Sequence, residues 1–234
     1  MAVTIKERTS PNHDERGTGV DMIVLHYTGM ESADGARQRL CDPEAKVSAH
    51  YFIDEDGAVE RLVPDDRRAW HAGVASWQGV TDINARSIGI ELVNPGHEFG
   101  YRFFPDAQIT ALEALLVELM ARHGVPPARV VGHSDVAPAR KSDPGELFPW
   151  MRLAQQGLAA PLPPHGLTGS RAPSSRGTKA LGQLALIGYD TADSKAATLA
   201  FQRHFRPGFL TGDMDAGTVN AADWLVQNLD KPAL

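Results

Sequence analysis

The sequence is poor in cysteine, in net positive charge and in long apolar runs. Cys41 is the only cysteine among 234 residues, so a disulfide within the chain is impossible and a thiolate-rich zinc site is excluded. The 23 Lys and Arg are outnumbered by 29 Asp and Glu, and a net charge of −6 argues against a nucleic-acid partner. The strongly apolar run nearest the start spans only residues 22–27, whereas a membrane-spanning helix needs roughly 20 apolar residues.

The N-terminal segment also lacks the features of an export signal. Residues 2–21 carry seven charged side chains, Asp21 included, and contain no apolar stretch of the length a secretory signal requires. Cys41 does not follow an apolar segment, so it offers no site for a lipid anchor. These observations predict a cytoplasmic protein without a membrane anchor, unless a leader has been removed.

Charge and composition change along the chain. Residues 1–150 contain 15 Lys and Arg against 23 Asp and Glu, whereas residues 151–234 contain 8 against 6. Residues 158–177 are rich in proline, glycine and serine, a composition typical of a linker. We therefore expect a first domain at residues 1–157, a linker at 158–177 and a second domain at 178–234.

Hydrophobic patterning indicates an α/β fold for the first domain. Short β-branched runs predict strands over residues 22–27, 47–54, 58–63, 87–93 and 129–131. Apolar spacing of three and four residues predicts helices over 32–40, 106–123 and 149–156, while 64–86 and 132–145 are expected to be loops. The expected architecture is a mixed central β-sheet flanked by helices, followed by a small all-α domain of three helices at about 178–187, after Asp193 and after Asp215.

Three side chains form a candidate metal site. His26 and His133 each end a predicted strand, and Asp143 lies in a loop that Pro138 and Pro144 stiffen. Two imidazoles and one carboxylate form the ligand set of a catalytic zinc site that keeps one position open for water. The alternative is that His133 and Asp143 only bond to loop backbone.

Two charged residues extend this candidate site. Glu91 lies in the otherwise apolar stretch 87–93, where a carboxylate is costly unless it is paired or exposed. It is either an outward-facing side chain or a general base for a metal-bound water. Lys141 is two residues from Asp143, where a cation would stabilise a developing oxyanion.

Several segments together resemble a known enzyme family. They are SPNHDERG (10–17), IVLHYTGM (23–30), VSAHYFIDEDGAVERLV (47–63), AWHAG (69–73), NARSIGIELVN (84–94) and VGHSDVAPARKSDPGELFPW (131–150). With them the chain resembles the zinc-dependent N-acetylmuramoyl-L-alanine amidases of the amidase-2 family, in particular the AmiD-type members, whose fold is that of the peptidoglycan recognition proteins. GQLALIGYD (182–190) and AFQRHFRP (200–207) resemble a small helical peptidoglycan-binding module.

The resemblance implies roles for individual residues. It makes His26, His133 and Asp143 ligands of Zn²⁺, Glu91 the catalytic base and Lys141 the electrostatic stabiliser. Ala49 stands where some members of the family have a tyrosine, so Glu91 must carry the proton. The residues that match the substrate-binding positions of the family are Trp70, His71, Ala72, Gly73, Asn84 and His50, although Trp70 is also a candidate core aromatic and His50 a candidate hydrogen-bonding core residue.

The expected reaction is hydrolysis of the amide between the lactyl group of N-acetylmuramic acid, or its anhydro form, and L-alanine of the stem peptide. The expected partners are therefore peptidoglycan fragments, or muropeptides, and the expected setting is cytoplasmic cell-wall recycling. The alternatives are a non-catalytic module that binds such fragments, a zinc peptidase that cuts within the stem peptide, and an exported or lytic amidase of cell-wall remodelling.

Overall fold

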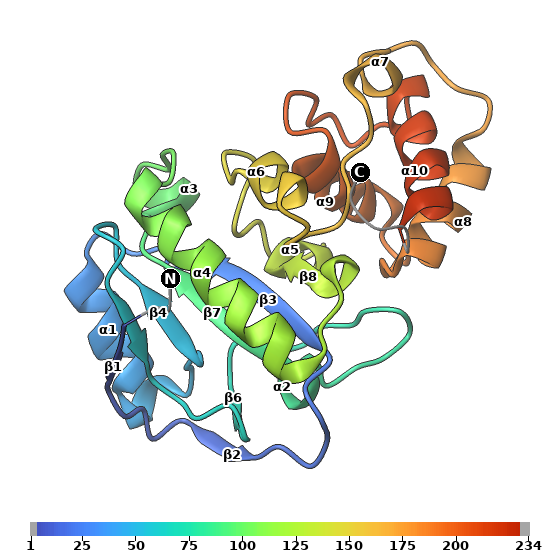
Figure 1. Cartoon of the computed structure of the whole chain (residues 1–234). Coiled ribbons are helices and arrows are strands. Elements are labelled where there is room, and N and C mark those ends of the chain that lie inside the picture. Colours follow the sequence, from blue (N-terminus) through green and yellow to red (C-terminus); the bar gives the residue numbers. More distant parts are fainter. Residues whose placement is uncertain (1–3, 230–234) are drawn as a thin grey trace.

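A six-stranded mixed sheet forms the centre of the first domain. The computed structural model describes residues 4–229 (Figure 1). The strand order is β1-β5-β4-β7-β3-β8, and only the β4–β5 pair is antiparallel. The strands are β1 (Ile5–Glu7), β3 (Met22–Tyr27), β4 (Tyr51–Ile53), β5 (Val59–Arg61), β7 (Ser87–Leu92) and β8 (Val130–Gly132). A separate antiparallel pair joins β2 (His13–Glu15) to β6 (Arg67–Ala69).

Helices surround this sheet and continue into the C-terminal part of the chain. The long helices are α1 (Ala33–Cys41), α4 (Asp106–His123), α8 (Gly177–Ile187), α9 (Ser194–Phe205) and α10 (Ala216–Asn228). The short ones are α2 (Ile83–Arg86), α3 (Gly96–Phe99), α5 (His133–Val136), α6 (Trp150–Gln155) and α7 (His165–Thr168), with 3₁₀ turns η1 (Pro43–Ala45) and η2 (Pro127–Arg129). The expected α/β sheet with a small helical C-terminal domain is confirmed.

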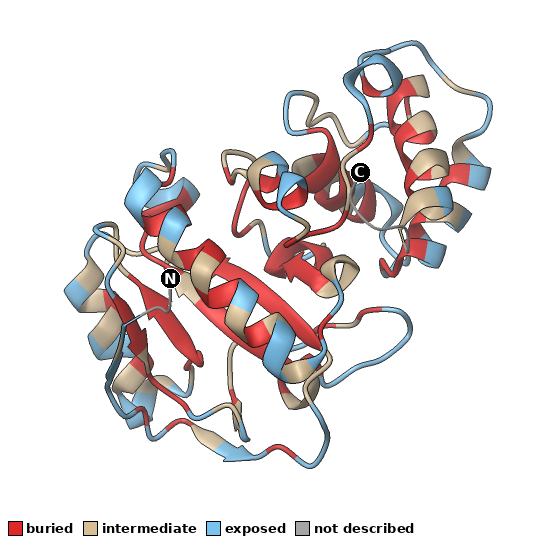
Figure 2. Ribbon diagram, in the orientation of Figure 1, coloured by how far each residue is buried: buried red, intermediate tan, exposed pale blue. Residues whose placement is uncertain are grey.

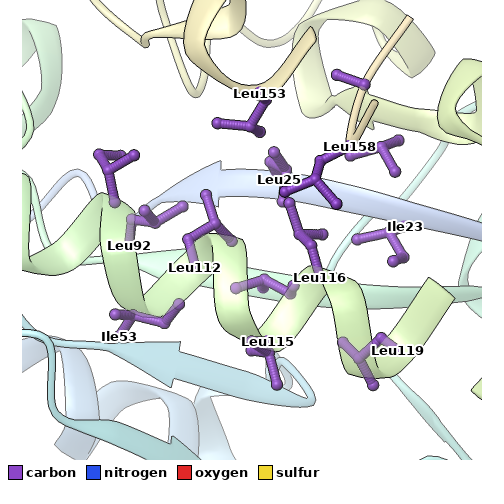
Figure 3. Packing of buried hydrophobic residues seen from close by; sticks show 14 of the residues in the cluster. Ile23, Leu25, Ile53, Leu92, Leu112, Leu115, Leu116, Leu119, Leu153 and Leu158 are labelled. Carbon is purple, nitrogen blue, oxygen red and sulfur yellow. The ribbon is translucent and has the colours of Figure 1, made fainter. Parts of the chain in front are cut away.

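Residue alternation along the central strands gives the sheet two different apolar faces. Ile23 and Leu25 of β3 pack with leucines of α4, as Figure 3 shows. Met22 and Val24 point to the opposite face and belong to a cluster that includes Leu184 of the C-terminal helices. Figure 2 shows buried residues in the sheet, throughout α5, on part of α6 and in the helices of the C-terminal domain. The two parts of the chain therefore share buried apolar surface.

Several short elements differ from the sequence-based expectation. β1 and β2 lie in the segment before Met22, β6 lies in the expected loop 64–86, α5 in the expected loop 132–145 and α7 in the expected linker. These elements have only three or four residues, too few to show a period. α4 begins at the expected residue, Asp106, whose side chain makes no capping hydrogen bond and pairs with Arg152.

The expected linker begins inside packed structure. Leu158 and Ala159 belong to the α4 side of the core, and Ala160 belongs to the cluster that includes the C-terminal helices. Among residues 4–229, no helix has both the length and the apolar character needed to cross a bilayer.

A buried carboxylate joins the two parts of the chain. Asp135 in α5 is 1% exposed and accepts hydrogen bonds from the Gly132 amide (2.7 Å), the Tyr189 hydroxyl (2.7 Å) and His204 Nδ1 (2.8 Å). The His204 ring stacks between Trp150 and Phe205, with centroid separations of 3.7 and 4.0 Å. A buried charge is tolerated only when hydrogen bonds replace its water, and here two of the three donors come from the helical domain.

We predict that Tyr189→Phe lowers the free energy of unfolding by about 1–3 kcal/mol, because the buried carboxylate loses one donor while its burial remains. Urea denaturation of the full chain measures this change. Val117→Ala, at a position 56% exposed, serves as the control and should stay within about 0.5 kcal/mol of the parent. An unchanged stability of Tyr189→Phe would show that the Asp135 contacts contribute nothing measurable.

Candidate metal centre

The candidate ligands meet at the carboxyl ends of two neighbouring parallel strands. His26 is the penultimate residue of β3, and His133 directly follows β8. Because Leu25 pairs with Gly132 in the β3–β8 register, the two histidines that come next lie side by side. Asp143 reaches them from the loop after α5, where its carbonyl accepts the Ser134 amide at 2.9 Å. The structure thus brings the three expected ligands together.

The ligand atoms are close and buried. His26 Nδ1 lies 2.9 Å from His133 Nδ1 and 3.0 Å from Asp143 Oδ2, and His133 Nδ1 lies 3.1 Å from the same carboxylate oxygen. All three residues are at most 6% exposed. These distances are near the roughly 3.3 Å edge of a tetrahedron whose ligands sit about 2.0–2.1 Å from a central zinc.

The protonation states of the three candidate ligands favour the binding of a cation between them. His133 Nε2 lies 3.0 Å from the Ala72 carbonyl, which only accepts, so Nε2 carries a proton. In the tautomer with this single ring proton, Nδ1 directs a lone pair toward His26 and Asp143. Burial, reinforced by His133, lowers the pKa of His26 to about 4, so this ring is neutral at pH 7. Electron-pair donors thus converge on one point, and this donor set fits a zinc ion.

Glu91 lies beside this cluster. In the β3–β7 register it pairs with His26, so both side chains point to the same face of the sheet. Its Oε2 is buried and has no hydrogen-bond partner within residues 4–229. Burial raises the pKa of Glu91 well above its usual value, Asp143 adds to this effect, and Lys141 opposes it. The carboxyl group is therefore poised to exchange a proton.

One cleft of about 400 Å³ contains all of these groups. Its lining includes the three candidate ligands together with Glu91, Lys141, Trp70 and His71. Arg39, Arg140 and Glu98 also line it, so the cleft carries charges of both signs. A molecule that filled this cleft would lie against Glu91, Lys141 and the candidate ligands at once.

Arg140 ties the wall of the cleft together. Its guanidinium donates to the carbonyls of Ala72 (2.8 Å) and Val74 (2.6 Å) and lies against Gly73, whose φ of +60° is easily adopted by glycine. Ala72 itself is buried, and its carbonyl also receives the His133 proton. Ala72 and Gly73 themselves do not line the cleft, and their backbone instead positions Arg140 and His133, which do.

Two further residues expected to bind substrate lie behind the cleft wall. His50 is fully buried, where its Nδ1 accepts the Gly89 amide at 2.9 Å and its Nε2 lies 3.0 Å from the Arg67 carbonyl. Asn84 Oδ1 accepts the amides of His71 (3.1 Å) and Ala72 (2.7 Å). Neither residue lines the cleft, so the structure gives both a supporting rather than a substrate-contacting position.

His71 lines the cleft, but both of its ring nitrogens have partners inside the protein. Nδ1 lies 3.1 Å from His26 Nε2, and Nε2 lies 3.2 Å from Ser87 Oγ. Burial, with His26 next to it, lowers the pKa of His71 well below its usual value, so the ring is neutral. Of the expected substrate-binding side chains, Trp70 is the one whose half-buried ring is left to face a ligand.

Comparison with known proteins places this site in a family. Residues 16–146, more than half of the chain, match the family model Amidase_2, described as N-acetylmuramoyl-L-alanine amidase. The chain belongs to this amidase family. The resemblance inferred from the sequence motifs is therefore confirmed.

The amidase is similar to curated relatives along most of its length. It is 37% identical over 231 residues to N-acetylmuramoyl-L-alanine amidase AmiD of Escherichia coli K12, covering 89% of this chain and 83% of that protein. It is 43% identical over 108 residues to 1,6-anhydro-N-acetylmuramyl-L-alanine amidase AmpD of Citrobacter freundii, covering 46% of this chain and 56% of the relative.

Solved structures extend the similarity to the helical domain. The amidase superposes with a TM-score of 0.82 and 34% identity on E. coli AmiD in complex with anhydro-N-acetylmuramic acid-L-Ala-D-gamma-Glu-L-Lys, covering 95% of this chain and 94% of AmiD. It matches Pseudomonas aeruginosa AmpDh3, in complex with an anhydromuramic pentapeptide, with a TM-score of 0.75 and 31% identity, covering 97% and 96%. The expected reaction, hydrolysis of an N-acetylmuramoyl-L-alanine amide, is thereby supported for this chain.

The motif-based reading missed the residues that support the site. Ser87, Gly89, Arg140 and Asp135 were not assigned functional roles. Ser87 and Gly89 lie against His71, which is next to His26, whereas Arg140 and Asp135 bind the backbone of Ala72 and Gly132 beside His133. Gly89 carried a usable signal, because an isolated glycine inside an apolar strand indicates a close approach by another group.

We predict that the parent chain binds about one zinc ion and that His26→Ala loses it, because two remaining protein ligands cannot hold the metal against a competing chelator. Metal analysis after dialysis at micromolar free zinc measures the content. His165→Ala, at an exposed histidine outside the cleft, is the matched control and should keep the ion. Full zinc content in His26→Ala would exclude His26 as a ligand.

Proposed function

We propose that the protein is a zinc-dependent amidase that cleaves soluble anhydro-muropeptides between the lactyl carbonyl of the muramic acid and L-alanine, as a step of cytoplasmic cell-wall recycling. The observation that carries this proposal is the single cleft in which His26, His133 and Asp143 converge beside Glu91 and Lys141. The anhydro-muramic peptides present in the AmiD and AmpDh3 complexes support the substrate class.

The metal would be held by His26 Nδ1, His133 Nδ1 and the Asp143 carboxylate. Bound zinc supplies an acidified water and polarises the substrate carbonyl. The protein contributes the orientation of the ligands and a partly enclosed cleft that limits competing solvent. The rest of the chemistry rests on Glu91 and Lys141.

Glu91 carries the proton in this proposal. Its unpartnered Oε2 can take a proton from the attacking water and deliver it to the amine of L-alanine as the C–N bond breaks. Burial raises the pKa of Glu91, and a divalent cation held by the three ligands would lower it again, which suits a group that must both accept and donate a proton. Ala49 is buried and has no titratable side chain, so Glu91 has no substitute at that position.

Lys141 acts on the charge that develops on the substrate. Its side chain lines the cleft, and its backbone amide bonds to the Ala137 carbonyl at 3.0 Å, which fixes the loop that presents it. Its positive charge favours the negative oxygen that forms when water adds to the carbonyl. A module that only binds fragments has no need for this lysine and for an unpartnered buried carboxyl beside a metal site, so catalysis is favoured.

The domain division belongs to the same proposal. We take residues 1–157 as the catalytic domain, 158–177 as the connection and 178–234 as a helical domain that contacts peptidoglycan fragments. The similarity to AmiD over almost the whole chain supports a two-part enzyme. The Asp135 contacts indicate that the helical domain also stabilises the catalytic one.

We predict that Glu91→Gln lowers kcat/KM for an anhydro-muropeptide by about 10²–10⁴-fold while the protein keeps its zinc, because the amide preserves the shape but cannot carry the proton. Steady-state kinetics combined with metal analysis tests this. Glu98→Gln is the matched control, since Glu98 is an exposed carboxylate on the same cleft, and its rate should change only a few fold. Near-parental turnover of zinc-loaded Glu91→Gln would refute the base assignment.

We predict that product analysis by mass spectrometry yields anhydro-muramic acid sugars and a peptide with a free N-terminal L-alanine. Equal amounts of substrate presented as anhydro-muropeptides and as intact sacculi should give faster release from the soluble fragments. Cleavage inside the stem peptide would indicate a peptidase, and no cleavage a binding module. Faster release from sacculi, or recovery of the native protein outside the cytoplasm on fractionation, would overturn the recycling role.

A further inference from the structure

The short helix α2 lies behind both candidate histidine ligands. Ser87 follows the helix as the first residue of β7, and Asn84 lies within it. Ser87 reaches His26 through His71, and Asn84 reaches His133 through Ala72. The same five-residue segment, 83–87, is therefore linked to both rings, although neither ring touches it.

The proton positions along the first link follow from one backbone carbonyl. Ser87 Oγ lies 2.6 Å from the Ile83 carbonyl, which only accepts, so the hydroxyl proton is directed there. Ser87 Oγ can then only accept from His71 Nε2, which must carry the proton of the neutral ring. His71 Nδ1 is consequently an acceptor.

The proton position on His71 in turn determines the proton position on His26. Because His71 Nδ1 accepts, the His26 Nε2 that lies 3.1 Å away must donate to it. A neutral His26 with its proton on Nε2 has a lone pair on Nδ1, the atom that faces His133 and Asp143. The hydrogen-bond chain from Ile83 thus selects the tautomer that a metal at this point requires.

The sheet leaves space for the His71 ring between Ser87 and His26. Ser87, Gly89 and Glu91 alternate along β7 on the same face as His26, and the His71 ring lies over the middle position. A Cβ atom on residue 89 would come within 2.4 Å of His71 Cγ. Gly89 therefore leaves the space in which His71 bridges Ser87 and His26.

The second link, from Asn84 to His133, runs through backbone groups of residues 71 and 72. Asn84 Oδ1 accepts hydrogen bonds from the backbone amides of both His71 and Ala72. These two bonds fix the backbone at residues 71 and 72 and therefore the position of the Ala72 carbonyl. That carbonyl receives the proton of His133 Nε2 at 3.0 Å and leaves His133 Nδ1 free for the metal. Arg140 Nη2 donates to the same carbonyl and holds it in place.

We propose that the 83–87 segment is an orienting support for the metal centre, in which Ser87 acts through His71 on His26 and Asn84 acts through Ala72 on His133. His71 is by this inference a positioning residue, although the sequence assigned it to substrate binding. The inference rests on the proposed zinc amidase function and deepens it by naming the groups that set both ligand tautomers.

The test uses the full chain with Ser87→Ala, His71→Leu and His71→Asn. Zinc affinity is measured by competition with a chromogenic chelator, and the His26 tautomer is read from ¹⁵N chemical shifts of the zinc-free protein. We expect His71→Leu to bind zinc about 10–100-fold more weakly. His71→Asn should recover most of that loss, since its amide oxygen can occupy the place of Nδ1 and accept from His26.

Ser10→Ala is the matched control for Ser87→Ala. Ser10 is as buried as Ser87, and its hydroxyl also donates to a carbonyl at 2.6 Å, that of Leu40, but it lies outside both the cleft lining and the chain of hydrogen bonds to His26. Ser87→Ala should weaken zinc binding by about tenfold and shift the His26 proton toward Nδ1, whereas Ser10→Ala should change neither.

The outcomes separate this inference from the proposed function. Parental zinc affinity and an unchanged His26 tautomer in both Ser87→Ala and His71→Leu would overturn the orienting support while leaving the zinc amidase intact. A parent chain that binds no zinc would refute the proposed function, and the tautomer of His26 in the same zinc-free samples would still decide the role of His71.

Discussion

The parallel pairing of β3 with both β7 and β8 is the constraint on which the site depends. One register sets Leu25 beside Gly132, and the other sets His26 beside Glu91. Side chains that follow or end these strands therefore meet at one edge of the sheet without any need for a long loop. A shift of one residue in either pairing would turn His26 or its neighbour to the opposite face, where α4 covers the sheet.

Burial determines the protonation states at the candidate metal site, and it also carries a free-energy cost, because charged and polar groups there lose their contact with water. The ligands are almost fully enclosed, and burial disfavours every charged form there. The protein compensates with neutral histidine rings, with cations along the cleft and with hydrogen bonds from backbone that is itself tied down. Asp135 follows the same rule two residues beyond His133, and its donors come partly from the helical domain. The boundary visible in composition is thus crossed by polar contacts in the folded chain.

The sequence predicted the parts of the fold that have a period and the parts of the site that end strands. β3, β7, α4 and the three C-terminal helices carry clear apolar patterns, and most of their apolar residues are buried, with Val117 and Leu186 as exposed exceptions. His26 and His133 could be recognised because each follows a buried run. β1, β2 and β6 could not, since three polar or mixed residues form a strand only through pairing with distant backbone.

The supporting residues were hidden for a related reason. Asn84 and His50 matched a family pattern, but the pattern does not say whether a side chain faces the cleft or the protein interior. That distinction depends on which backbone amides lie nearby, and those amides come from residues 71–72 and 89. The position of Asp143 was easier to predict, because its loop follows β8 and α5 directly in the chain and must therefore lie near His133.

The close contact between residues 71 and 89 links the two positions as a pair. While position 71 holds an imidazole, position 89 admits only glycine, and a larger residue at 89 would demand a smaller one at 71. A mutant library that varies either position alone would find almost every change deleterious and would report two unrelated invariant sites. Only a library that varies both together could reveal that they are a single solution to one packing problem, and could show whether another pair fills the same space.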